Sequence, residues 1–190
     1  MEQTNQRTAF VAIVGCPNVG KSSLLNAMLG QKIAIVSSKP QTTRTRIMGV
    51  YTQGEVQLVF IDTPGLHKSK NRLDDYMARS ISESVSGVDA CILVVEEGQP
   101  LRPGDEELLE KMKKQELPAV LVINKIDRQP NKEKLMGQIA SLIKKYSFEA
   151  VVPVSALEKD GVSLLLQELE RLAQPGEHFF AEDEITDMPE

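Results

Sequence analysis

The sequence predicts an α/β fold in which a mostly parallel sheet is covered by helices on both faces. Strand and helix signals alternate along almost the whole chain, which is typical of repeated βα units. The apolar strand segments lack the alternation of polar and apolar residues that marks a half-exposed strand, as expected for a sheet buried on both sides. A length of 190 residues favours a single main domain.

The predicted elements follow one another in a regular order. The first strand, 8–14, ends at Gly15, and the first helix, 21–29, ends at Gly30. After a polar loop at 31–45, two strands at 46–52 and 56–62 flank a Gln53-Gly54 turn. The later elements are predicted as a helix at 71–86, a strand at 88–95, a helix at 103–116, a strand at 118–124, a helix at 132–146, a strand at 150–154 and a helix at 161–173.

The net charge of −5 is concentrated at the C-terminal end of the chain. Residues 177–190 hold six acidic side chains and no Lys or Arg, whereas 22 basic and 21 acidic side chains remain in residues 1–176. We therefore expect one domain at 1–176 and a weakly ordered acidic tail or linker at 177–190. Residues 32–79 carry eight basic and four acidic side chains, so this stretch is a candidate for contact with RNA phosphates.

Composition excludes several classes of protein. The apolar runs are far shorter than the roughly 20 residues of a membrane-spanning helix. The first ten residues lack the apolar core of a secretion signal, so we expect a cytoplasmic location. Two cysteines 75 positions apart and two histidines form no zinc or disulfide pattern, which favours reduced thiols.

A phosphate-binding loop is predicted between the first strand and the first helix. Residues 15–22, GCPNVGKS, match the pattern GxxxxGK[ST] in the strand–loop–helix context that the motif requires. Glycines let the backbone N–H groups face one concavity, and the following helix adds its positive end. Lys21 would reach the β- and γ-phosphates, Ser22 would bind Mg²⁺, and we interpret Cys16 as a small filler. The nucleotide-binding residues predicted here are Gly15, Cys16, Pro17, Asn18, Val19, Gly20, Lys21, Ser22 and Ser23.

A second motif selects the base. Residues 124–127, NKID, follow a predicted strand, and a carboxylate at Asp127 can accept hydrogen bonds from N1–H and N2–H₂ of guanine. Adenine offers no such donor pair, so it would leave the carboxylate unpaired. Asn124 would connect this loop to the phosphate loop, and the stem of Lys125 would pack on the base, with Ile126 between them. The alternative is a helix-capping aspartate, which is common after a strand.

Two shorter motifs complete the candidate site. Residues 62–65, DTPG, end a strand, where Asp62 can hold Mg²⁺ through water and the N–H of Gly65 can meet a γ-phosphate. The alternative is a plain turn. Ser155 and its successor follow the last strand, where backbone N–H groups can meet the guanine carbonyl. The nucleotide-contacting residues predicted from these two segments are Asp62, Thr63, Pro64, Gly65, Leu66, Ser155, Ala156 and Leu157.

Together these motifs resemble the translation-factor-related GTPases with a Ras-like P-loop NTPase G domain. The resemblance covers residues 8–173 and implies a six-stranded sheet whose second strand is antiparallel, with five helices around it. It implies GTP/GDP and Mg²⁺ as cofactors and Thr43, with Thr42 its rival, as the loop threonine that reaches Mg²⁺ beside Ser22 and Asp62. The catalytic residues implied are Lys21, Thr43, Gly65 and Asn18.

Within this superfamily the chain is most similar to the bacterial ribosome-assembly GTPases. The similarity lies in PNVGKSSLLN, in PQTTRTR at 40–46, in DTPGLH and in EITD at 184–187. It implies a GTP-hydrolysing switch in small ribosomal subunit assembly and 16S rRNA maturation. The implied partners are guanine nucleotide, 16S rRNA and the 30S subunit, reached mainly through an RNA-binding KH domain beyond residue 190. We expect a monomeric G domain, and peripheral contact with the inner face of the cell membrane is left open.

Departures from the Ras pattern concern catalysis. Leu66 stands where Ras-like enzymes carry a water-positioning glutamine, so intrinsic hydrolysis should be slow. Leu157 replaces the lysine that follows Ser-Ala in Ras-like proteins. In GTPases that resemble this one, an asparagine at the position of Asn18 helps to bind K⁺, which would stabilise developing phosphoryl charge. The alternative is that Asn18 only supports the loop.

Three other functions compete with an assembly GTPase. A P-loop phosphotransferase is disfavoured by NKID and by the lack of an apparent acceptor lid. A signalling or trafficking GTPase would be supported by a lipidation motif, which the end of this sequence lacks. A related GTPase of RNA modification or ribosome assembly is the nearest rival.

Overall fold

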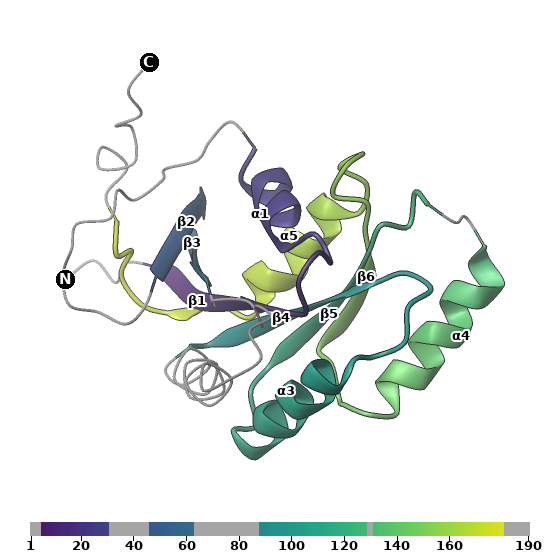
Figure 1. Cartoon of the computed structure of the whole chain (residues 1–190). Helices are drawn as coiled ribbons and strands as arrows, with labels where there is room; N and C mark the ends of the chain where they lie inside the picture. The colour runs from purple at the N-terminus through teal and green to yellow at the C-terminus, as the bar shows by residue number, and fades with distance from the viewer. Residues whose placement is uncertain (1–4, 31–45, 63–87, 129–130, 181–190) are drawn as a thin grey trace.

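A computed structural model gives the structure of the chain and describes residues 5–30, 46–62, 88–128 and 131–180. Strands and helices alternate in the described part, as the sequence predicts (Figure 1). The elements in chain order are β1 (Arg7–Val14), α1 (Lys21–Leu29), β2 (Arg46–Gln53), β3 (Val56–Asp62), β4 (Ala90–Glu96), α3 (Pro103–Lys114), β5 (Ala119–Asn124), α4 (Lys132–Ile143), β6 (Ala150–Pro153), α5 (Val162–Arg171) and β7 (Gln174–Pro175). The helix predicted at 71–86 lies outside the described residues.

The strands form one mixed sheet in the order β2-β3-β1-β4-β5-β6. Strands β3, β1, β4, β5 and β6 are parallel, and only β2 in this series runs antiparallel to its neighbour, β3. The prediction of a mostly parallel sheet with an antiparallel second strand is therefore confirmed. Because parallel strands share a direction, their carboxyl ends lie along one edge of the sheet, where α/β proteins bind ligands.

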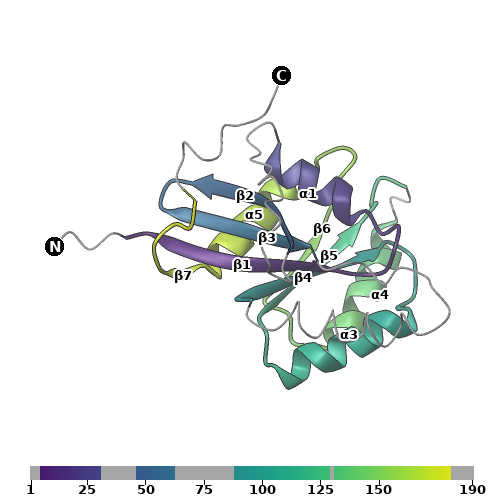
Figure 2. The ribbon, with the colours of Figure 1, turned by 60° about the vertical axis from the view of Figure 1, so that its left-hand side comes forward.

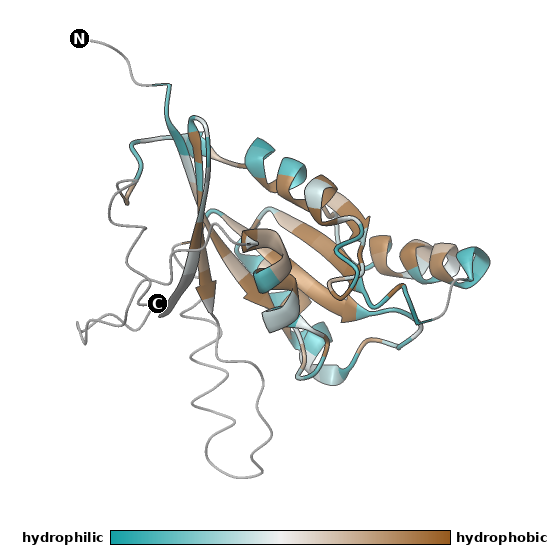
Figure 3. Ribbon diagram, turned by 90° about the horizontal axis from the view of Figure 1, so that it is seen from above, coloured by the Kyte–Doolittle hydropathy of each residue, from teal (hydrophilic) through white to brown (hydrophobic). Residues whose placement is uncertain are grey.

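Helices cover both faces of the sheet, with α1 and α5 on one side and α3 and α4 on the other (Figures 1 and 2). Successive side chains of β1 alternate between the two layers. Val11 and Ile13 pack with α1 and α5, whereas Ala12 and Val14 pack with α3. Figure 3 shows apolar strands between helices that carry both apolar and polar residues. In the described part of the chain, no helix is long and apolar enough to cross a membrane.

The ends of some elements differ from the predicted ones for local reasons. The strand predicted from residue 88 begins at Ala90, and Asp89 before it is bonded to Phe10 through both its backbone N–H and its carboxylate, at 2.9 and 2.8 Å. The helix predicted to reach residue 116 ends at Lys114, and Glu116 adopts a left-handed φ of 50° that turns the chain towards β5. Such effects of tertiary contacts are not visible in residue patterns.

The sheet has a seventh strand that the sequence did not predict. The two residues of β7 pair antiparallel with Arg7 and Thr8 at the start of β1. This position is open because β4 pairs with β1 only from Val11 onwards. We call residues 174–180 the docked segment, since its contacts with the sheet continue past β7 to Phe180. The division at residue 176 stays a prediction.

A buried glutamine holds the docked segment. Gln57 in β3 is fully buried, and its side-chain oxygen accepts the backbone N–H groups of Phe179 and Phe180 at 2.9 and 3.2 Å. Its amide nitrogen donates to Thr52 Oγ1 at 3.1 Å and to the carbonyl of Phe180 at 3.0 Å. The ring of Phe179 meets that of Phe10 edge-to-face, with centroids 4.7 Å apart. The side chain of Gln57 is therefore fully used in binding backbone and a hydroxyl.

We predict that Gln57→Ala lowers the free energy of unfolding by about 1–3 kcal/mol, because buried backbone groups of the docked segment lose their partners. Urea unfolding followed by circular dichroism measures the change. Gln53→Ala is the matched control, since Gln53 is an exposed residue at the end of β2, and its effect should stay within about 0.5 kcal/mol. Equal effects of the two substitutions would contradict the role assigned to Gln57.

Candidate functional site

Four of the predicted motifs meet at the carboxyl edge of the sheet. The loop at 15–20 follows β1, Asp62 ends β3, NKID begins at the last residue of β5, and Ser155 lies just after β6. The backbone of Asp62 pairs with Ile13, so DTPG starts next to the strand that leads into the phosphate loop. The topology therefore brings together residues that are up to 140 positions apart in the sequence.

The phosphate loop depends on two glycines. Gly15 has a φ of +150°, and a Cβ there would come within 2.5 Å of the carbonyl oxygen of Val94. Gly20 has a φ of +95°, and its Cβ would lie 2.3 Å from the amide nitrogen of Asn124. Any larger residue would push the loop away from the strands that support it. The glycines of the motif are thus required by packing as well as by backbone conformation.

The start of α1 is suited to an anion. Gly20 is the N-cap and supplies no side-chain cap, and no acidic residue lies in the first turn. By contrast, α3 carries Asp105 and Glu106 in its first turn. A helix N-terminus without a capping carboxylate leaves its positive end available for phosphate. The residues present therefore fit the phosphate groups of a nucleotide.

Lys21 is held at the phosphate loop. Its ammonium group donates to the carbonyl oxygens of Gly15 and Cys16 at 2.7 and 2.8 Å, and the side chain is half-buried. Ser22 and Ser23, which follow in the first turn of α1, are exposed. The exposed hydroxyl of Ser22 fits its predicted role as a Mg²⁺ ligand, because hydroxyl and carboxylate oxygens suit this ion.

Asn124 joins three loops of the site. It is 2% exposed at the end of β5, and its amide nitrogen donates to the carbonyl of Val19 at 2.9 Å. Its amide oxygen accepts the backbone N–H of Ala156 at 3.1 Å. The prediction that Asn124 connects the base loop to the phosphate loop is confirmed, and the same side chain also fixes the loop after β6.

Lys125 turns back over the phosphate loop. It has a left-handed φ of 67°, which is uncommon for a residue with a side chain. Its ammonium group donates to the carbonyl of Asn18 at 2.6 Å and pairs with Glu96 at 3.2 Å. Asn18 is exposed and also has a φ of 67°. Two strained backbone positions thus face each other across the site, as is common where a ligand is bound.

The carboxylate of Asp127 is oriented by a buried hydroxyl. Ser155 is fully buried, and its Oγ donates to Oδ1 of Asp127 at 2.7 Å. The same Oγ accepts the N–H of Glu158 at 3.1 Å, and Ser155 pairs through its backbone with Asp160. Leu157 is 81% exposed beside this loop. Ser155 therefore has a side-chain role in addition to the backbone role that its position in the sequence predicts.

Cys16 is held beneath the phosphate loop by α3. It is 4% exposed, and its thiol donates to Oδ1 of Asp105 at 3.3 Å. Burial, together with the charge of Asp105, raises the pKa of the Cys16 thiol to about 11. Arg102 adds a bond to the carbonyl of Pro17 at 3.3 Å. Its burial and raised pKa favour the interpretation of Cys16 as a filler over that of an activated thiol.

Several predicted site residues lie outside the described part of the chain. They are Thr42, Thr43, Thr63, Pro64, Gly65 and Leu66. Most of the basic residues of the 32–79 stretch also lie outside it. The backbone of Asp62 is described at the end of β3, next to β1. The roles assigned to these residues stay predictions.

Three residues that support the site from its periphery belong to no motif of the sequence. They are Glu96, Asp105 and Gln138. Glu96 could have been noticed as an acidic residue at the end of a predicted strand. Asp105 and Gln138 lie within predicted helices, where no sequence pattern shows which loop they contact.

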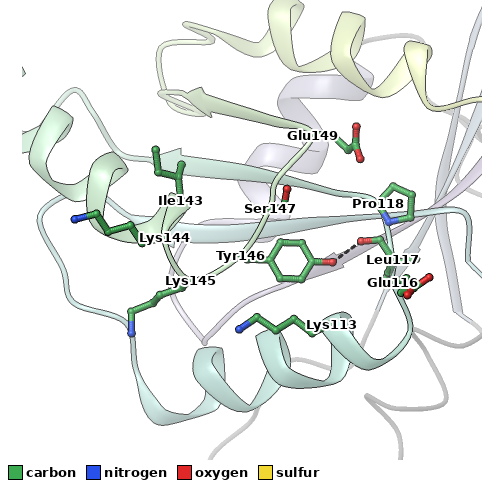
Figure 4. A pocket seen from close by; sticks show the side chains of 10 residues that line it. All are labelled: Lys113, Glu116, Leu117, Pro118, Ile143, Lys144, Lys145, Tyr146, Ser147 and Glu149. Carbon is green, nitrogen blue, oxygen red and sulfur yellow. Dashed lines mark hydrogen bonds between the residues drawn. The ribbon is translucent and has the colours of Figure 1, made fainter.

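A separate pocket of about 690 Å³ lies at the opposite edge of the sheet, where β5 and β6 begin (Figure 4). Tyr146 fills its floor, and its hydroxyl donates to the carbonyl of Leu117 at 2.5 Å. The helix predicted to reach residue 146 ends at Ile143, and Tyr146 packs in the buried cluster with residues of α3 and α4. The pocket is not part of the loop cluster.

The fold and these loops define a GTPase domain with a Ras-like P-loop fold. Residues 10–125 match the model of the 50S ribosome-binding GTPase family, and the chain belongs to this family. Similarity to curated proteins indicates a narrower group within this family. The chain is 45% identical over 184 residues to a protein named GTPase Era from Ruminiclostridium cellulolyticum, and 41% identical to GTPase Era from Clostridioides difficile. It covers 61–62% of these relatives' length, and 97% of this chain is aligned.

Solved structures of the same name are similar. A single-residue variant of Era from Aquifex aeolicus bound to GDP and AlF4⁻ matches with a TM-score of 0.79 and 36% identity, over 97% of this chain and 63% of that chain. An Era structure with MgGDPNP and nucleotides 1506–1542 of 16S ribosomal RNA matches equally well, with the same coverage. The family resemblance inferred from the motifs is confirmed by these relatives and structures named Era.

We predict that Cys16 is alkylated slowly near neutral pH and faster only as the pH approaches about 11, because the reactive thiolate forms at high pH. Asp105→Asn removes the negative charge beside the thiol, so alkylation should begin at lower pH. Iodoacetamide labelling followed by peptide mass spectrometry measures Cys16 separately from Cys91. Glu106→Gln, a charge change in the same helical turn, should leave the profile unchanged, and a similar shift in both variants would contradict the assignment.

Proposed function

We propose that the chain binds GTP and GDP with Mg²⁺ and hydrolyses GTP slowly, as the switch of a protein that acts in small ribosomal subunit assembly and 16S rRNA maturation. The observation that carries the proposal is the joining of the phosphate loop and the NKID loop by Asn124 at the carboxyl edge of the sheet. A site built this way holds the base and the phosphates of one guanine nucleotide at the same time. The relatives named Era support the assembly role.

Different residues of the site would bind the phosphates, the metal ion and the base. Lys21 and the start of α1 bind phosphate, Ser22 and Asp62 would hold Mg²⁺, and Asp127 would accept the donors of guanine. When bound, Mg²⁺ neutralises charge on the phosphates. Leu66 cannot orient water, which is the basis for slow intrinsic hydrolysis. Release of γ-phosphate would relax the segments that carry Thr43 and Gly65.

The partners and location belong to the same proposal. An Era structure containing a 16S rRNA fragment supports contact with 16S rRNA in the complete protein, and hence with the 30S subunit. We assign this contact mainly to a KH domain outside the present sequence, with a contribution from the basic 32–79 stretch. A monomer in the cytoplasm completes the proposal, and peripheral contact with the inner face of the cell membrane is left open.

Base selectivity gives the most direct test of the nucleotide assignment. Asp127→Asn should change the preference from GDP to xanthosine diphosphate, because the 2-carbonyl of xanthine needs a donor. The amide oxygen of the new side chain can still accept the hydroxyl of Ser155, so the loop should keep its structure. Titration with fluorescent nucleotide analogues measures both affinities.

Asp160→Asn is the control for this substitution, because Asp160 is exposed and pairs with Ser155 through backbone atoms only. It should leave the guanine preference intact. Unchanged GDP affinity in Asp127→Asn would contradict the role of Asp127, and tight ATP binding by the unmodified chain would contradict the proposed function.

Lys21→Ala should abolish nucleotide binding.

Stimulation by K⁺ is tested separately. We expect GTP turnover to be faster in KCl than in NaCl at equal ionic strength, with Asn18 as a ligand of the ion. Asn18→Gly removes the side chain without straining the backbone at a φ of 67°, and it keeps the carbonyl that Lys125 binds. The variant should lose the difference between the two salts. Equal turnover of the unmodified chain in both salts would rule out the K⁺ proposal.

A further inference from the structure

Glu96 lies beside the base loop, at the last position of β4. Its backbone pairs with Asn124 at the end of β5, so the two strand ends are neighbours. The side chain is 16% exposed, which is low for a glutamate at the edge of a sheet. Its carboxylate is therefore placed beside the turn that follows Asn124.

The carboxylate contacts the base loop on both sides of Asp127. Oε2 of Glu96 lies 3.2 Å from the ammonium group of Lys125, and Oε1 lies 3.1 Å from Nη1 of Arg128. The backbone N–H of Arg128 donates to the carbonyl of Lys125 at 3.1 Å, which closes the turn between the two cations. One side chain therefore spans the turn whose central carboxylate would recognise guanine.

Glu96 is itself held from a second element. Gln138 in α4 donates through Nε2 to the carbonyls of Glu96 and Gln99 at 3.0 and 3.2 Å, and its Oε1 accepts the N–H of Gly98 at 3.0 Å. These bonds hold the backbone of Glu96 and of the loop that follows it. Helix α4 therefore holds the backbone of Glu96, and the two ion pairs hold its carboxylate.

Lys125 connects this arrangement to the phosphate loop. Its ammonium group contacts both Glu96 and the carbonyl of Asn18. A lysine that made only the bond to Asn18 would keep an unneutralised charge near the loop and more rotational freedom. With Glu96 present, the charge is paired in a half-buried position, where an ion pair is screened less by salt than on the open surface.

From these contacts we propose that Glu96 is a positioning residue for guanine recognition. It holds Lys125 and Arg128 so that the carboxylate of Asp127 meets both N1–H and N2–H₂ of the base. The inference rests on the proposed function, because it assigns a role within the nucleotide site. Glu96 does not touch the base, and it acts through the shape of the turn from Asn124 to Arg128.

The experiment compares GDP with inosine diphosphate, which lacks the 2-amino group and so can make only one of the two bonds to Asp127. Dissociation constants are measured by calorimetry or with fluorescent analogues for the unmodified chain, Glu96→Gln and Arg128→Gln. Glu110→Gln is the control, since Glu110 pairs only with Lys113 on the exposed face of α3 among the described residues. Thermal unfolding is recorded for every variant.

We expect Glu96→Gln to weaken GDP binding by about tenfold, the loss expected for one charge-assisted contact. It should weaken binding of inosine diphosphate less, so that discrimination between the two bases decreases. Arg128→Gln, at a position 62% exposed and tolerant of substitution, should show the same change in smaller measure. The control should match the unmodified chain.

The outcomes separate the inference from the proposed function. Equal weakening of both nucleotides, or affinities unchanged from the unmodified chain, would overturn the role of Glu96 while leaving the GTPase assignment intact. A chain that binds guanine and adenine nucleotides equally well before any substitution would instead overturn the proposed function. If Glu96→Gln unfolds, the ratio measured for Arg128→Gln decides between a positioning role and none.

Discussion

The contact between Asn124 and the phosphate loop is the constraint on which the candidate site depends. A buried amide must satisfy both its donor and its acceptor, and Asn124 does so with the backbone of two different loops. The contact is possible only because Gly20 has no Cβ, since a methyl group there would lie 2.3 Å from the amide nitrogen. Asn124 can therefore make its contact only where residue 20 is a glycine, although the two residues are 104 positions apart.

The rest of the site is arranged around this contact by elements that would never touch a nucleotide. Helix α3 holds the phosphate loop from below through Asp105 and Arg102, and α4 holds the loop after β4 through Gln138. Each of these bonds joins a helix to a loop at the carboxyl edge. The helices therefore do more than cover the sheet, because they fix the loops against which a ligand would bind.

Sequence patterns predicted the order of the elements, the parallel sheet and the motif residues of the site. These features depend on local residue types and spacing, which the chain displays directly. The patterns could not predict β7, because its two residues, Gln174 and Pro175, pair with β1 only where β4 leaves a gap. They also missed Glu96 and the hydroxyl of Ser155, whose roles depend on distances across neighbouring strands. Contacts of this kind follow from the fold and become visible only once it is known.

The position of the docked segment has a structural consequence for the site. Strand β1 carries the phosphate loop at its carboxyl end and pairs with β7 at its amino end. Strand β3 ends at Asp62 and, five residues earlier, holds Phe179 and Phe180 through Gln57. Both strands are inner members of the sheet and are bonded on each side, so they are rigid elements. The path of the chain at Phe180 is therefore fixed relative to the phosphate loop and Asp62 by the same two strands.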